Sequence, residues 1–269
     1  WSSDVCSSDL AALPPLAVRM RPRSLAEVRG QADVLRVGSP LRRLIEGSGG
    51  RAGPISAILW GPPGTGKTTL AHLVASAAGR EFVELSAITA GVKDVRAVMD
   101  QAARNRDLYD RQTVLFLDEI HRFTKAQQDA LLPGVENRQV ILVAATTENP
   151  SFSVIAPLLS RSVLVTLTSL SDNDIREVIE AAVTSEGGLA AAYTLGEEAR
   201  EHLVRVSGGD ARRALTALEA AAGVAEDLRG VRGDDAATSI TLAAVEQAMA
   251  QAAVRYDRTG DQHYDVASA

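Results

Sequence analysis

The sequence has little cysteine and few aromatic residues. A single cysteine, Cys6, stands among the 269 residues, which excludes an internal disulfide framework and a cysteine-based zinc site. Aromatic residues make up only 4% of the chain, whereas alanine is abundant. The hydrophobic share of 46% and the charged share of 23% are close to the average for soluble globular proteins. This composition favours a helix-rich cytosolic protein.

Long apolar runs and an excess of positive charge are also absent. No stretch approaches the ~20 apolar residues that span a bilayer, and the start shows no signal-peptide pattern. We therefore expect a cytoplasmic protein with no membrane partner. The formal net charge is −6, so any contact with nucleic acid must come from a local basic patch. The histidines lack metal-ligand spacing and are assigned to packing or solvent: His72, His121, His202 and His263.

Composition and periodicity divide the chain into four parts. Residues 1–15 begin without Met, repeat the triplet SSD and are interpreted as a non-native or disordered leader. Residues 16–168 carry the strand and helix patterns of an α/β domain, and residues 169–255 carry helical patterns alone. Residues 256–269, with a loop-like stretch at 258–261, are interpreted as the start of a truncated C-terminal region.

The front of the chain alternates between apolar runs and helical stretches. Four short runs predict buried parallel strands: Ile55–Trp60, Phe82–Leu85, Val114–Leu117 and Val140–Ala145. Three stretches with helical periodicity lie between them: Lys67–Ala78, Asp94–Tyr109 and Lys125–Leu132. Strand and helix in alternation predict a doubly wound α/β domain with a parallel sheet.

The back of the chain is predicted to be a small all-helical domain. Ser171 and Asp174 form a capping box ahead of an amphipathic stretch. Further helices are predicted at 197–206, from Asp210 onward and from Thr241 onward, with a polar loop at 226–237.

A glycine-rich motif lies between the first predicted strand and the first helix. Residues 61–68 read GPPGTGKT and fit the pattern G-x-x-x-x-G-K-[ST], whose backbone N–H groups surround phosphate oxygens. Lys67 should extend to the β and γ phosphates, and Thr68 should supply a hydroxyl to Mg²⁺. The expected nucleotide contacts are Gly61, Pro62, Pro63, Gly64, Thr65, Gly66, Lys67, Thr68 and Thr69. ATP and Mg²⁺ are therefore the expected cofactors.

Two acids end the third predicted strand. Ligands of α/β sheets bind beyond the carboxyl ends of strands, so Asp118 and Glu119 should lie beside the phosphate loop. Asp118 would hold the water shell of Mg²⁺, and Glu119 would orient and polarise the attacking water. Since a small-molecule kinase has no water to activate, Glu119 favours hydrolysis.

Other polar residues give weaker signals. Thr147 and Asn149 follow the fourth strand, and either could contact the γ-phosphate or the attacking water. Arg161 follows a short apolar segment, and Arg212 and Arg213 stand at the start of a rear helix. Each arginine, taken alone, is typical of a surface cation.

With these residues in hand, the chain from Leu16 onward resembles an AAA+ ATPase of the replication-associated recombination protein A family. This family is related to the Werner-helicase-interacting protein and to clamp loaders. The resemblance rests on RMRP, GQ, LWGPPGTGKTTLA, residues 86–95, LFLDEIHRFTKAQQDALLP, ATTENPSF, LLSR, GGDARRAL and GDQHYD.

The resemblance implies further roles. Val28 and Gln31 would lie near the adenine, Thr147 or Asn149 would act as sensor 1, and Arg212 would act as sensor 2 from a helical lid. Arg161 would be an arginine finger that acts in trans within a homo-oligomer. The family acts on DNA at forks, ends and single-strand/double-strand junctions, with single-stranded-DNA-binding protein as a partner, so a nucleoid-associated location is implied.

Three alternatives remain open at this stage. A protein-remodelling motor would use an aromatic residue on a central loop, but residues 86–107 contain none and offer Lys93, Arg96, Arg104 and Arg106. These cations suit DNA phosphates and equally suit a solvated helix face. A non-catalytic clamp-loader-like subunit would lack part of the active site, and a branch-migration helicase would carry a winged helix after the lid.

Overall fold

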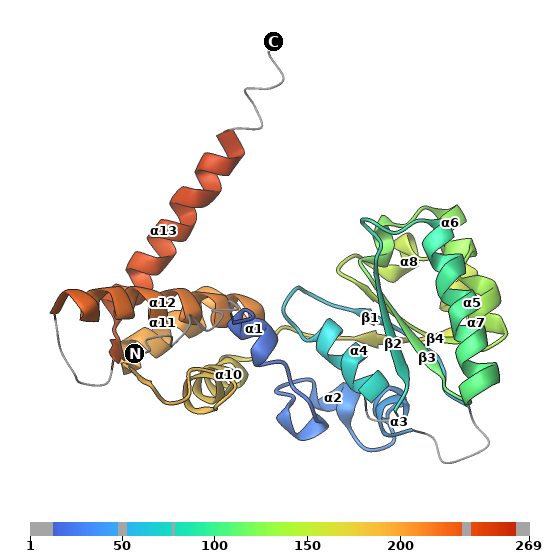
Figure 1. Ribbon diagram of the computed structural model, residues 1–269, viewed down its shortest axis with the longest axis horizontal. Coiled ribbons are helices and arrows are strands. Elements are labelled where there is room, and N and C mark those ends of the chain that lie inside the picture. Colours follow the sequence, from blue (N-terminus) through green and yellow to red (C-terminus); the bar gives the residue numbers. More distant parts are fainter. Residues whose placement is uncertain (1–12, 48–52, 77–78, 233–237, 262–269) are drawn as a thin grey trace, which may run out of the picture. The chain divides into compact units, whose positions relative to one another are not determined.

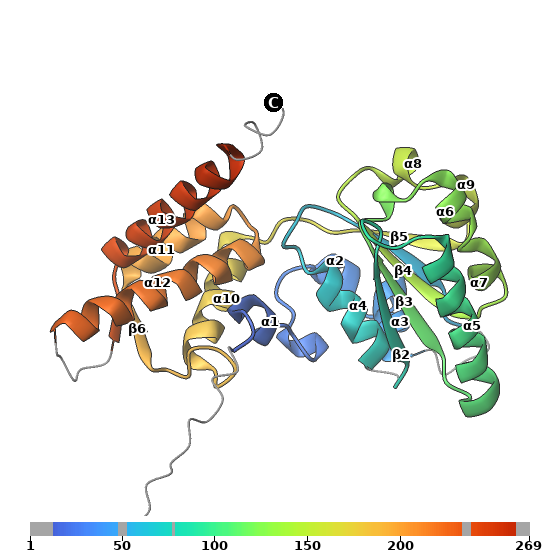
Figure 2. The same ribbon diagram turned by 45° about the horizontal axis from the view of Figure 1, so that its top comes forward.

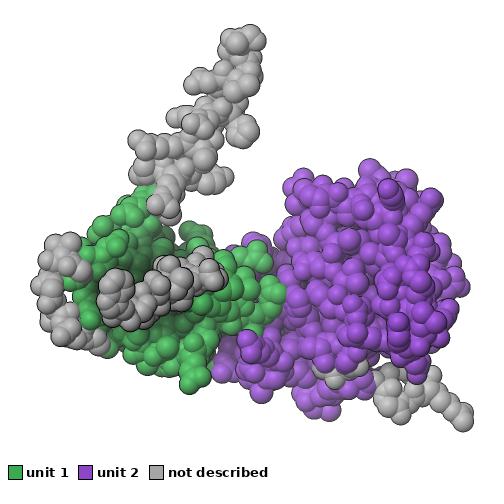
Figure 3. Space-filling model, viewed as in Figure 1, with its two compact units in different colours: residues 1–21, 176–206, 212–269 green, residues 22–175, 207–211 purple. Residues whose placement is uncertain are grey.

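The computed structural model describes residues 13–47, 53–76, 79–232 and 238–261. The chain forms two compact units, which are coloured separately in Figure 3. We call residues 22–175 with 207–211 the sheet unit, and residues 1–21, 176–206 and 212–269 the helical unit. The predicted boundaries of the four parts of the chain remain predictions.

A five-stranded parallel sheet forms the centre of the sheet unit (Figure 1). Its strands are β1 (Ser56–Trp60), β2 (Glu81–Ser86), β3 (Thr113–Asp118), β4 (Val140–Thr146) and β5 (Ser162–Thr166), in the order β2-β3-β4-β1-β5. All four neighbouring pairs are parallel. The doubly wound parallel fold is thus confirmed.

The edge strands depart from the prediction. The four predicted strands are present, but β2 is half-buried rather than buried, because it pairs with a neighbour on one side only. The fifth strand, β5, was not predicted. Its five residues SVLVT are mostly half-exposed or exposed, as suits the other edge of the sheet.

Alternate residues of the central strands face two helical layers. On one face Leu59, Val114 and Phe116 pack with α3 (Pro40–Glu46) and α4 (Lys67–Ser76). On the other face Ile58, Leu115 and Leu117 pack with α5 (Val92–Tyr109), η2 (Ile120–Arg122) and α7 (Leu132–Glu136). The period of two along each strand therefore produces a three-layer arrangement.

Short helices fill the connections of the sheet unit. They are η1 (Leu25–Glu27), α2 (Ala32–Leu35), α6 (Lys125–Asp129), α8 (Pro150–Ser153) and α9 (Ala156–Leu159). The single helix predicted at 125–132 is wrong, since α6 ends at Asp129 and α7 begins at Leu132 with Pro133 in its first turn. Residues 77–78, at the end of the helix predicted from Lys67, lie outside the described residues.

The helical unit contains α1 (Leu16–Arg19), most of α10 (Asp172–Thr184) and α11 (Glu197–Ser207), α12 (Ala211–Arg232) and α13 (Leu242–Asp261), as Figure 2 shows. The Ser171–Asp174 capping box and the Thr241 cap are both present. None of the described helices is long and apolar enough to cross a bilayer.

Two features of the helical unit were not predicted. A short parallel pair, β6 (Tyr193–Leu195) with β7 (Thr238–Ile240), joins the helices. The Tyr193 hydroxyl donates to Glu226, and burial, followed by this carboxylate, raises the pKa of Tyr193 to about 12. The loop predicted from Glu226 is wrong as far as Arg232, because α12 continues to that residue, and 233–237 lie outside the described residues. The loop-like stretch at 258–261 belongs to α13.

We predict that Gly134→Ala destabilises the protein by ~0.5–1.5 kcal/mol, the cost of moving the Met99 side chain out of its preferred rotamer. A Cβ at Gly134, in α7, would lie 2.0 Å from the Met99 sulfur. The matched control is Gly223→Ala in α12, where nothing lies within 4 Å, and a gain of ~0.4–1 kcal/mol is expected. Denaturant unfolding of both variants measures the difference; an unchanged midpoint for Gly134→Ala would contradict the tight helix contact.

Candidate functional site

The glycine-rich loop connects the carboxyl end of β1 to the first turn of α4. Its entry is fixed by Gly61, whose N–H donates to the Thr146 carbonyl at 3.2 Å. Gly64 and Gly66 have φ values of +69° and +94°, which L side chains rarely adopt. The Lys67 side chain is buried, and its Nζ donates to the Gly61 and Pro62 carbonyls at 2.8 and 2.7 Å. The lysine therefore reaches back across the loop that it follows.

A returning segment covers the tip of this loop. Residues 207–211 belong to the sheet unit, and the Ala211 N–H points to the Gly64 carbonyl at 3.4 Å. A Cβ at Gly64 would lie 1.8 Å from the Asp210 carboxylate. Position 64 therefore requires glycine both for its backbone conformation and for space.

The two residues predicted near the adenine have different contacts in the sheet unit. The Gln31 side chain donates to the Thr168 carbonyl at 2.7 Å and to the Thr65 carbonyl at 3.4 Å, and accepts from the Thr168 N–H at 3.3 Å. It thus bridges the phosphate loop and the segment after β5. Val28 is partly buried against the apolar cluster beneath α3 and α4.

The two predicted acids end β3 at the same sheet edge as the phosphate loop. Asp118 accepts the Glu119 N–H at 3.1 Å, and Glu119 itself has a φ of +56°. Both residues are half-buried. Since β4 lies between β1 and β3, the two strand ends are separated by two strand spacings, or roughly 10 Å.

The end of β4 places polar groups between the ends of β1 and β3. Thr146 is fully buried, and its hydroxyl accepts the Glu148 N–H at 3.0 Å. Thr147 and Asn149 are exposed, and the Asn149 side-chain oxygen caps α8 by accepting the Ser151 N–H. Of the two sensor candidates, Asn149 already has this structural task.

A histidine assigned from sequence to packing or solvent joins this group. The His121 side chain is 6% exposed, with Nε2 at 3.1 Å from the Glu119 carboxylate and Nδ1 at 3.0 Å from the Thr146 hydroxyl. Sequence reasoning missed both His121 and Thr146. The available signal was their place, since each lies within three residues of a predicted site residue at the end of a buried strand.

The predicted metal ligands have the chemistry that Mg²⁺ requires. Thr68 offers a hydroxyl and Asp118 a carboxylate, and oxygen donors of this kind suit a hard cation that keeps several waters. Within the described ranges no group of three or more His, Cys, Asp or Glu side chains could hold a metal ion.

Arg161 lies at the amino ends of the strands, whereas the phosphate loop lies at their carboxyl ends. It directly precedes β5, whose first residue, Ser162, pairs with Ser56 at the start of β1. Because β1 has five residues, this edge lies roughly 16 Å from the phosphate loop at ~3.3 Å per residue. The Arg161 guanidinium pairs with Glu136 at 2.7 Å and donates to the Pro157 carbonyl at 2.9 Å.

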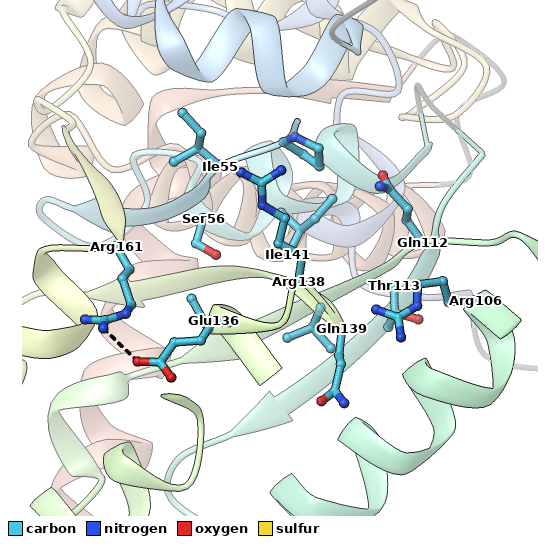
Figure 4. A pocket seen from close by; sticks show the side chains of 13 residues that line it. Ile55, Ser56, Arg106, Gln112, Thr113, Glu136, Arg138, Gln139, Ile141 and Arg161 are labelled. Carbon is cyan, nitrogen blue, oxygen red and sulfur yellow. Dashed lines mark ion pairs between the residues drawn. The ribbon is translucent and has the colours of Figure 1, made fainter. Parts of the chain in front are cut away.

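A pocket of about 310 Å³ opens beside Arg161, lined also by Arg106 and Arg138 (Figure 4). These cations and the pair between Arg161 and Glu136 lie at the amino ends of β1, β3 and β4, away from the phosphate loop.

The last predicted arginine, Arg212, is the second residue of α12 and belongs to the helical unit, so its role stays a prediction.

Two domain families match the chain. The family of ATPases associated with various cellular activities matches residues 57–170, and the AAA C-terminal domain matches residues 189–269. The first match covers the phosphate loop, both acids and Arg161. The chain therefore matches an AAA domain followed by an AAA C-terminal domain.

Two curated proteins are similar to this chain over most of its length. An uncharacterized AAA domain-containing protein of Mycobacterium tuberculosis is 56% identical over 95% of this chain and 54% of its own length. Replication-associated recombination protein A of Escherichia coli K12 is 43% identical over 95% of this chain and 55% of its own length. The chain spans about half the length of these curated relatives, and over that half it is similar to replication-associated recombination protein A.

A solved structure supports the fold. The Thermotoga maritima RuvB Holliday junction branch migration motor has a TM-score of 0.67 and 28% sequence identity, covering 86% of this chain and 72% of its own.

Proposed function

We propose that this chain is a Mg²⁺-dependent ATPase with its nucleotide site at the carboxyl edge of β1, β4 and β3. The observation that carries the proposal is the place of β4, directly between the strand before the glycine-rich loop and the strand that ends in Asp118. ATP phosphates lie in the ring of backbone N–H groups at the start of α4. The phosphate-loop contacts are Gly61, Pro62, Pro63, Gly64, Thr65, Gly66, Lys67, Thr68 and Thr69.

Lys67 exchanges its carbonyl partners for phosphate oxygens when the nucleotide binds. Its Nζ is held by the Gly61 and Pro62 carbonyls at the mouth of the loop, so a short rotation suffices. Thr68 and Asp118 would hold Mg²⁺, which would supply positive charge to the phosphate oxygens. Glu119 orients and polarises the attacking water.

Residues around the edge complete the site. Thr147 is the better sensor 1 candidate, because it is exposed between the two loops while the Asn149 oxygen caps α8. Gln31 and Val28 contact the adenine side, and the bonds of Gln31 to Thr65 and Thr168 support this role. Arg212 acts as sensor 2 from the helical unit, a role that rests on the family resemblance.

Arg161 completes the site of a second copy of the chain. Its position at the amino edge of the sheet, roughly 16 Å from its own phosphate loop, leaves it unable to reach its own nucleotide. A guanidinium supplied in trans stabilises charge on the transferred phosphoryl group. The ATPase is therefore a homo-oligomer.

The proposed substrate is DNA at forks, ends and single-strand/double-strand junctions, with single-stranded-DNA-binding protein as a partner. The similarity to replication-associated recombination protein A of Escherichia coli supports this proposal. The proposed location is the cytoplasm, at the nucleoid.

A second candidate function is branch migration, which is favoured by the similarity to RuvB. Clamp-loader-like and protein-remodelling roles have no such observation in their favour.

We predict opposite behaviour for two variants of the site. Lys67→Ala should weaken ATP binding, because it removes the cation that meets the phosphates. Glu119→Gln should bind ATP as the parent does and lose hydrolysis by about 10²–10⁴-fold, the usual contribution of a positioned acid or base. Nucleotide titration and steady-state turnover separate the two. Equal loss of binding in both would contradict the assigned roles.

The trans role of Arg161 is testable by mixing inactive variants. Arg161→Ala keeps its own nucleotide site, and Glu119→Gln keeps its own finger. Each alone should lose activity, by about 10³-fold or more for the finger. A mixture should regain turnover, because a site of the first variant receives the finger of the second. A mixture that stays as inactive as its parts, at concentrations where assembly is verified, argues against a finger in trans.

DNA should stimulate the ATPase if the substrate assignment is correct. Turnover is measured with forked DNA, gapped DNA and no DNA over a range of protein concentrations, with Arg161→Ala as control. We expect stimulation that rises steeply with protein concentration and disappears in the variant. Activity indifferent to DNA favours a protein-remodelling role, and selective stimulation by four-way junctions favours branch migration.

A further inference from the structure

His121 connects the proposed water-orienting acid to the end of β4. It lies in η2, two residues after Glu119, and its side chain is 6% exposed. Nε2 lies 3.1 Å from Glu119 Oε2, and Nδ1 lies 3.0 Å from Thr146 Oγ1. Both ring nitrogens therefore have a polar partner at the carboxyl edge. A second carboxylate, that of Glu148, is more distant, at 3.8 Å from Nε2, and is 61% exposed.

The partners define the hydrogen-bond directions of a neutral ring. An ionised carboxylate only accepts, so the ring proton belongs on Nε2 and is donated to Glu119. The Thr146 hydroxyl has two possible acceptors, Nδ1 at 3.0 Å and the Glu148 carbonyl at 3.3 Å. In this tautomer its proton is donated to the nearer one, Nδ1, while the hydroxyl oxygen accepts the Glu148 N–H. This tautomer is inferred from the partners and satisfies both ring nitrogens at once.

Thr146 is also bonded to the phosphate loop. Its carbonyl accepts the Gly61 N–H at 3.2 Å, and its side chain is fully buried. A continuous chain of bonds thus runs from Glu119 through His121 and Thr146 to the first residue of the loop. The chain of bonds links three strand ends, because Glu119 and His121 follow β3, Thr146 ends β4 and Gly61 follows β1.

We propose that His121 is the positioning residue for Glu119, holding its carboxylate toward the attacking water by a bond anchored on Thr146. The inference rests on the proposed role of Glu119. The Glu119 backbone is left-handed, and its side chain is 30% exposed, so a buried donor is needed to select one orientation. A carboxylate has roughly four acceptor positions, and the bond from His121 to Oε2 leaves it able to accept from water.

Two polar variants of similar burial test the proposal. Gln at position 121 places an amide donor near the former Nε2, whereas Asn reaches only as far as Nδ1. His121→Gln should keep kcat within several-fold of the parent, and His121→Asn should lower kcat on the order of 10²-fold, the usual result of misplacing a reacting group by ~1 Å. The dissociation constant for ATP, measured by nucleotide titration, should stay unchanged in both.

The anchor is tested separately at Thr146. Thr146→Val removes the hydroxyl with little change of volume and should lower kcat less than His121→Asn does. Thr146→Ser restores the hydroxyl and should restore kcat. This pair decides the question if a His121 variant fails to fold, as thermal unfolding would reveal.

The Glu119→Gln variant distinguishes a failure of this inference from a failure of the proposed function. If Glu119→Gln itself hydrolyses ATP at the parental rate, the role of Glu119 fails. If Glu119→Gln is inactive but His121→Asn and Thr146→Val turn over as the parent does, only the positioning role of His121 fails. A faster His121→Asn variant would also overturn it, by showing that the histidine holds Glu119 away from water. In single turnover, adding His121→Asn to Glu119→Gln should cause no further loss.

Discussion

The parallel pairing of β4 with both β1 and β3 is the constraint on which the site depends. Parallel neighbours end at the same edge, so the loops that follow these three strands must meet there. Trp60 pairs with Thr146, and Leu117 pairs with Ala144, which fixes the heights of the phosphate loop and of Asp118 relative to the end of β4. Reversing or shifting one of these strands would separate the glycine-rich loop from the acids.

The parallel pairing of β5 with β1 has a consequence at the amino ends of the strands. Arg161 precedes β5, and β5 starts level with β1, so the arginine is carried to the edge opposite the phosphate loop. The pair with Glu136 and the nearby Arg106 and Arg138 give that edge a cationic pocket. In the proposed function, the phosphate loop and Arg161 are two halves of a site at opposite ends of the sheet, and these halves meet between copies of the chain.

Much of this arrangement could be predicted from local patterns. The phosphate loop and the acid pair were predictable because each has a fixed motif next to a buried apolar run, and buried central strands give long runs of that kind. The edge strand β5 was missed because a half-exposed SVLVT segment lacks this signal. The ladder of β6 and β7 was missed because three-residue strands lie below the length that periodicity can detect.

Hydrophobic periodicity does not predict the contacts between the motifs. His121 has no metal-ligand spacing and follows the acids in a single 3₁₀ turn, so its sequence context gives no hint that it meets a residue 25 positions away. Asn149 and Thr147 are equivalent as sequence candidates, and only the bond from the Ser151 N–H to Asn149 separates them. Hydrogen bonds between strand ends depend on sheet order, which local patterns do not encode.

Burial explains why the end of β4 holds these groups together. Thr146 is fully buried, and a buried hydroxyl without partners costs roughly 1–3 kcal/mol, a cost that its contacts with His121 and Glu148 avoid. The same contacts fix the ring of His121, and through it the carboxylate of Glu119. Because the carbonyl of the same threonine holds Gly61, a displacement of the end of β4 shifts the supports of the phosphate loop and of the acid together. The polar residue that stabilises the strand end thereby also sets the geometry of the two loops on either side of it.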